Sequence, residues 1–98
     1  MKILGFENPT FSVGRNLTVR RGISWDCEVS AEIMVENLGL IEVGLQTSVM
    51  RFADLIDKDL IFEHDIDCRT VEGLLTVMEE VYPGFDRREI VTLVSFEM

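Results

Sequence analysis

The chain has 98 residues, enough for one domain and too few for two, so the sequence predicts a single domain over residues 1–98. Hydrophobic residues make up 47% of it and charged residues 28%, a composition typical of a globular domain and not of a disordered segment. The 18 acidic and nine basic side chains give a net charge of −9, which argues against binding to bulk DNA or to anionic membranes.

Residues 1–6, "MKILGF", predict a first strand, and "ENP" at 7–9 predicts the turn that closes it. This apolar stretch is too short for a signal peptide, and no segment approaches the ~18 apolar residues of a membrane helix. Cys27 and Cys68 are far apart and match no metal or redox motif, a pattern typical of reduced thiols. We therefore expect a cytoplasmic protein without membrane contact.

Two half-buried strands come next. In residues 16–20, "NLTVR", Leu17 and Val19 alternate with polar residues, so one face is apolar and the other is polar. The alternation is longer in residues 26–37, and its apolar positions share one face. These positions are Cys27, Val29, Ala31, Ile33 and Val35. We expect Cys27 to be a small core residue of this strand.

The middle of the chain predicts a hairpin followed by a helical turn. "NLG" at 37–39 is a turn sequence because Asn and Gly tolerate positive φ. A strand over 41–49 has alternate residues on one apolar face. Residues 51–60, "RFADLIDKDL", predict a short helical turn or a structured loop.

The helix over residues 70–82 has apolar residues at helical spacing, with Thr70 as its N-cap and Pro83-Gly84 at its end. Apart from Thr92, the last strand is apolar on both faces from Ile90 to Val94, as in a strand that is covered on both sides. This element order predicts an α+β fold, with a curved or closed antiparallel sheet of about five or six strands and one main helix packed over it.

A third of the basic residues lie in "GRNLTVRRGISW" at 14–25, as Arg15, Arg20 and Arg21. Asn16, Thr18 and Arg20 project from the same face of their strand. Their amide, hydroxyl and guanidinium groups together suit a carboxylate, a phosphate or a base edge. The alternative is that the arginines form surface ion pairs with the surplus of Asp and Glu, worth about 0–1 kcal/mol each.

Other residues also have two interpretations. Trp25 either plugs the core, the commoner role of a lone Trp in a small domain, or stacks on a base. The segment "EHDID" at 63–67 lacks any metal-binding spacing, so we interpret it as a solvated loop and expect neither a metal nor a cofactor. Cys68 has no His placed by the sequence to activate it, which argues against a nucleophilic role.

Several motifs resemble the ASCH domain family. A Gly-led strand ending in Thr-x-Arg, a middle turn, a helix ending in Tyr-Pro and a last strand occur in the family's order and spacing. They are "FSVGRNLTVRRG", "FADLIDKDL" and "TVEGLLTVMEEVYPGF…REIVTLVSFEM", and they span nearly the whole chain. The resemblance implies a PUA-like fold, a small β-barrel with helices at its mouth. It also implies binding of RNA or a modified nucleoside in a cleft beside the Thr18/Arg20 strand.

Some small bacterial members of this family are amidohydrolases that deacetylate N4-acetylcytidine. Their catalytic threonine corresponds to Thr18, their strand-end arginine to Arg20 and their acid to Asp67. Their lysine has no counterpart, because Arg15 or Asn16 stands in its place. Arginine stays protonated and asparagine has no basic nitrogen, so neither residue replaces it.

Three functions follow from the sequence. The first is recognition of RNA or a modified nucleoside, with ligand contacts from Arg15, Asn16, Thr18, Arg20, Arg21 and Trp25. The second is hydrolysis of a modified nucleoside, with Thr18 and Asp67 as catalytic residues. The third is interaction of the acidic surface with a basic protein partner.

Overall fold

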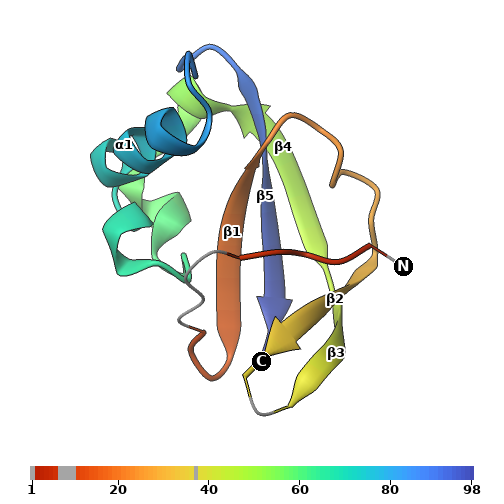
Figure 1. The fold of residues 1–98 in the computed structure, drawn as a ribbon. Coiled ribbons are helices and arrows are strands. Elements are labelled where there is room, and N and C mark those ends of the chain that lie inside the picture. Colours follow the sequence, from red (N-terminus) through yellow and green to blue (C-terminus); the bar gives the residue numbers. More distant parts are fainter. Residues whose placement is uncertain (1, 7–10, 37) are drawn as a thin grey trace.

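The computed structural model describes residues 2–6, 11–36 and 38–98 and shows an α+β fold (Figure 1). Its strands are β1 (Arg15–Arg21), β2 (Ser30–Val35), β3 (Gly39–Gly44), β4 (Gln46–Arg51) and β5 (Ile90–Glu97), and its helix is α1 (Val71–Val81). Three 3-10 turns, η1 (Phe52–Asp54), η2 (Asp57–Leu60) and η3 (Ile66–Cys68), connect β4 to α1. The predicted α+β class, helical turn and helix are confirmed.

The strands form two antiparallel sheets, one with the order β1-β5-β4 and one with β2 beside β3. Strand pairing within the described residues gives these separate sheets and no closed barrel. β5 is the central strand, since Val94 lies opposite both Thr18 of β1 and Thr47 of β4. Residues 91–96 are all buried, which confirms that the last strand is covered on both faces.

Two predicted strands are shorter in the structure. Ile3 makes only an isolated bridge with Glu32, while residue 1 and the turn predicted at 7–9 lie outside the described residues. β2 begins only at Ser30, because the chain turns through residues 22–27. Cys27 is exposed in this turn with a φ of 71°, so the prediction that it lies in the core is wrong. The alternating pattern thus begins at residue 26, before the chain enters the sheet at Ser30.

The strand predicted over 41–49 is divided at Leu45. β3 pairs with β2 before this residue, and β4 pairs with β5 after it, so one sequence run serves both sheets. Gly39 at the start of β3 has a φ of 78°, as expected in a turn, whereas Asn37 lies outside the described residues.

Two hydrophobic cores lie on opposite faces of β5. Val91 and Leu93 belong to the core beneath α1, whereas Val94 and Phe96 belong to the core that β2 and β3 cover. α1 starts where the Thr70 hydroxyl accepts a hydrogen bond from Gly73 N at 3.1 Å, which confirms the predicted N-cap. Its buried residues Leu74 and Met78 hold the helix beside the β1 edge of the sheet (Figure 1).

Candidate functional site

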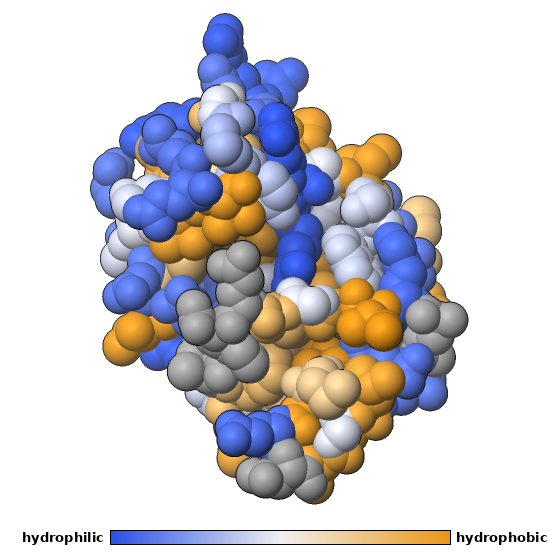
Figure 2. Space-filling model, in the orientation of Figure 1, coloured by the Kyte–Doolittle hydropathy of each residue, from blue (hydrophilic) through white to orange (hydrophobic). Residues whose placement is uncertain are grey.

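A concavity of about 470 Å³ lies beside β1, and we call it the β1 hollow. Its volume is within the range of small-molecule sites, about 300–1,000 Å³. Apolar surface gathers between α1 and the strands, next to the hydrophilic outer side of α1 (Figure 2). The polar and charged lining residues are Thr18, Arg20, Glu63, His64, Asp65, Asp67, Glu80 and Tyr82. The others are Gly5, Phe6, Val19, Cys68, Leu74, Val77, Met78 and Val81.

Arg20 is fixed in one position by its neighbours. Its Nε donates a hydrogen bond to the Thr18 hydroxyl at 3.1 Å, and its Nη2 donates to the Gly5 carbonyl at 2.6 Å. Its Cζ lies 4.8 Å from the centre of the Phe6 ring. Burial lowers the pKa of Arg20, but a guanidinium keeps its charge at neutral pH. Two of its five N–H groups are used in these bonds, so the others can bind a ligand.

Glu63 reaches the hollow because its segment extends the sheet beyond β1. Leu17 N donates to Phe62 O at 2.8 Å, and His64 N donates to Leu17 O at 2.9 Å. The Glu63 side chain between these bonds is only 3% exposed, and that of His64 is 13% exposed. The interpretation of residues 63–67 as a solvated loop is therefore wrong for these two residues. Leu60 and Cys68, on either side of the segment, are buried in the core beneath α1 and thereby hold the segment against it.

Burial determines the charge of both groups. It raises the pKa of the Glu63 carboxyl to about 8 and lowers the pKa of the His64 imidazole to about 4. Glu63 Oε1 lies 3.1 Å from His64 Nε2, and at neutral pH this is a contact between two neutral groups. A protonated carboxyl offers one O–H donor beside an acceptor oxygen, which is the pairing that a base edge requires.

The structure brings Thr18, Arg20 and Asp67 to the wall of the same hollow. Thr18 is buried, whereas Asp67 is exposed at the rim. The Asp67 backbone N–H is bonded to the Asp65 carboxylate at 3.0 Å, within η3. The acid that is buried in the hollow is thus Glu63, which the sequence analysis did not single out.

The remaining predicted ligand residues lie elsewhere. Asn16 is buried, and its amide bonds both the N–H and the carbonyl of Ser12, at 2.9 and 2.8 Å, so it holds the loop before β1. Arg21 forms a surface ion pair with Glu89 at 2.6 Å, as the alternative interpretation expected. Trp25 packs partly buried against the core that β2 and β3 cover, with Lys2 Nζ 4.5 Å from its ring centre.

Arg15 and Lys58 line a different concavity, and Lys2 bonds the Ser24 carbonyl, so the described residues bring no lysine to the β1 hollow. Burial raises the pKa of the Cys68 thiol to about 12, which keeps it protonated and unreactive. No three His, Cys, Asp or Glu side chains among the described residues are placed to hold a metal ion. The described residues also form no helix with the length and apolar character needed to cross a membrane.

The sequence matches no protein-family model. Comparisons with curated proteins and with solved structures find no match either. The candidate site is therefore defined by the geometry and the chemistry of the β1 hollow.

Proposed function

We propose that the protein binds a nucleoside, or one base of an RNA strand, in the β1 hollow as an ASCH-type domain of the PUA-like class. The observation that carries the proposal is the pairing of a fixed guanidinium, Arg20, with a buried carboxyl, Glu63, in one cavity. The two groups together provide donors and an acceptor for the edge of a base.

The walls of the hollow suit a planar ligand with one polar edge. Val77 and Val81 of α1 and Tyr82 provide apolar and aromatic surface. The plane of Arg20 can also stack on a base. Depletion of water from such a site strengthens each hydrogen bond, because the local dielectric constant is lower than in solvent.

The charges of the hollow favour a base over a phosphate. Asp65, Asp67 and Glu80 line it, and each of these carboxylates repels an anion. Among the described residues that line it, Arg20 is the one side chain that is cationic at neutral pH, because His64 is neutral there. The phosphate groups of a bound RNA strand would therefore lie outside the hollow.

Amide NMR titration with cytidine, uridine, adenosine and N4-acetylcytidine tests the proposal. We expect saturable shifts at Thr18, Glu63 and Val77 with at least one nucleoside. Arg20→Gln removes charge-assisted hydrogen bonds, so its affinity is expected to fall by about tenfold or more. Arg21→Gln, which removes the neighbouring charge outside the hollow, is the matched control. The absence of saturable shifts with every nucleoside, or an equal loss in both variants, would refute the proposal.

Hydrolysis of an acylated nucleoside is the second candidate function. It is favoured by the presence of the Thr18 hydroxyl and the Glu63 carboxyl in one hollow, because a group with a pKa of about 8 can exchange a proton near neutral pH. Incubation with N4-acetylcytidine should then release cytidine. Release no faster than with the Glu63→Gln variant leaves binding as the function.

A further inference from the structure

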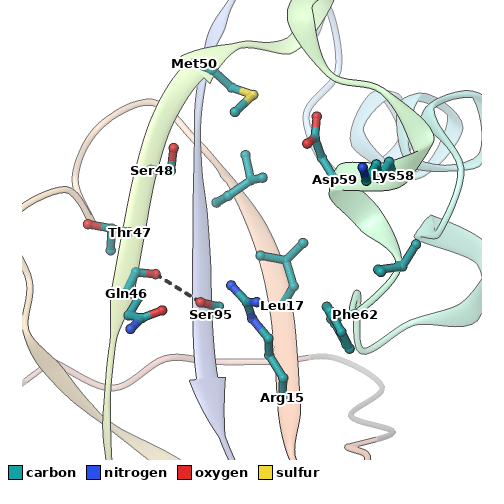
Figure 3. Close-up of a pocket in the computed structure, with 12 residues that line it drawn as sticks. Arg15, Leu17, Gln46, Thr47, Ser48, Met50, Lys58, Asp59, Phe62 and Ser95 are labelled. Carbon is teal, nitrogen blue, oxygen red and sulfur yellow. Dashed lines mark hydrogen bonds between the residues drawn. The ribbon is translucent and has the colours of Figure 1, made fainter.

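A second concavity, of about 400 Å³, lies on the face of the β1-β5-β4 sheet, and we call it the sheet groove (Figure 3). Side chains from the three strands form its floor, and η2 with residues 61 and 62 forms its wall. It shares no lining residue with the β1 hollow. The two cavities are nevertheless neighbours, because Leu17 of β1 lines the groove and Thr18 lines the hollow.

The sheet groove brings together two basic side chains, Arg15 and Lys58. Neither forms an ion pair with any residue in the described part of the chain, although carboxylates outnumber basic groups two to one in the sequence. Asp59 is the one acidic residue of the lining, and its Oδ2 accepts a hydrogen bond from Ile56 N at 3.0 Å within the η2 turn. The lining thus has a positive charge in a strongly acidic protein.

The groove also provides neutral donors and an apolar surface. Arg15 extends over the strands toward Gln46 and Ser95, while Lys58 lies on the wall opposite β4 (Figure 3). The Cζ of Arg15 is 5.3 Å from the centre of the Phe62 ring, so the ring supports the guanidinium. Phe62 is 42% exposed and offers the rest of its surface to a ligand. Ser48 of β4 is exposed and also lines the groove, where its hydroxyl is a further neutral donor.

We propose that the sheet groove binds the phosphate group of a nucleotide, either free or within a short RNA strand, through Arg15 and Lys58. Arginine binds phosphate with two parallel N–H bonds, and lysine adds a point charge. Phe62 provides a surface on which a base can stack. The ligand class rests on the proposed function, but the binding of phosphate rests on the groove alone. The protein would then have a separate site for the phosphate group of a nucleotide, which the acidic β1 hollow repels.

The test compares inorganic phosphate, cytidine 5′-monophosphate, cytidine and a cytidine trinucleotide by amide NMR. We expect the phosphorylated ligands to shift residues 46–50 and 93–95, and cytidine to leave them unchanged. The double variant Arg15→Gln/Lys58→Gln is expected to bind cytidine monophosphate about tenfold more weakly or worse. Arg51→Gln is the matched control, because Arg51 is an exposed arginine of β4 that does not line the groove. Tighter binding of the trinucleotide than of the monophosphate identifies an RNA strand as the source of the phosphate, and equal binding identifies a free nucleotide.

The proposal fails if phosphate and cytidine monophosphate leave residues 46–50 and 93–95 unshifted, or if Arg51→Gln weakens binding as much as the double variant does. These outcomes can be distinguished from failure of the proposed function, because nucleoside binding and the effect of Arg20→Gln test the β1 hollow separately. Cytidine binding without phosphate binding refutes the sheet groove alone. Phosphate binding without binding of cytidine, uridine, adenosine or N4-acetylcytidine refutes the β1 hollow alone.

Discussion

The β1 hollow and the sheet groove lie on either side of one strand and differ in charge. The hollow has one guanidinium among four acidic residues, Glu63, Asp65, Asp67 and Glu80. The groove has two basic groups, Arg15 and Lys58, beside one carboxylate, that of Asp59. A net charge of −9 thus opposes the binding of long polyanions, but the sign of the charge at each cavity depends on the few side chains that line it.

The largest effect is expected from Gly73→Ala, at the contact of α1 with the η3 turn, whose Asp67 and Cys68 line the hollow. A methyl group at position 73 would collide with the Asp67 carbonyl, where α1 packs on η3. We expect a loss of about 3 kcal/mol in the free energy of unfolding, measured by urea denaturation. Gly44→Ala is the control, since a methyl group there meets no atom within 4 Å. A Gly73→Ala variant as stable as the wild type would show that the helix does not pack on this turn.

The second effect concerns the buried acid of the hollow, and it depends on pH. Folding raises the pKa of Glu63 from 4.5 to about 8, so the folded state binds this proton more tightly. Its stabilising contribution is therefore present below pH 4.5 and is lost as the pH rises through 8. The pKa of His64 is lowered from 6.5 to about 4, so its contribution to stability has the opposite pH dependence. It is lost as the pH falls from 6.5 through 4.

Urea denaturation between pH 6.5 and 8.5 isolates the contribution of Glu63. The wild type is expected to lose about 2 kcal/mol across this interval. Glu63→Gln, which keeps a neutral side chain of the same shape, is expected to lose much less. Parallel pH profiles for the two proteins would mean that Glu63 is already ionised at neutral pH.

The smallest effect compares the two cavities by their response to salt. Cytidine is uncharged, so its affinity is expected to stay constant between 0.05 and 0.3 M NaCl. Cytidine monophosphate in the sheet groove is expected to bind about threefold more weakly at the higher salt, because its binding displaces counterions. Isothermal titration at both salt concentrations measures the difference. Equal salt dependence for both ligands would contradict the claim that the groove, unlike the hollow, binds its ligand by charge.

Local patterns predicted much of the fold and part of the site. The period of the 70–82 helix, its Thr70 cap and the doubly apolar last strand are local features, and the structure confirms them. The same strand periodicity puts Thr18 and Arg20 on one face, where the structure joins them by a hydrogen bond.

The burial of Glu63 was not predictable in this way. It depends on pairing between Leu17 and residues 62–64, which are distant in the sequence and carry no strand pattern. A polar segment of this kind is normally interpreted as a loop, and the family resemblance directed attention to Asp67. Cys27 shows the opposite error: it was predicted to be buried and is exposed, because an alternating pattern does not show where the chain enters the sheet.

The central position of β5 has a consequence for how the molecule unfolds. Each face of this strand belongs to a different core, so loss of either core exposes one side of it to water. β1, which contributes to the walls of both cavities, is paired along its length with β5. We therefore expect the two sheets to melt in one cooperative transition, in which both cavities are lost at the same temperature.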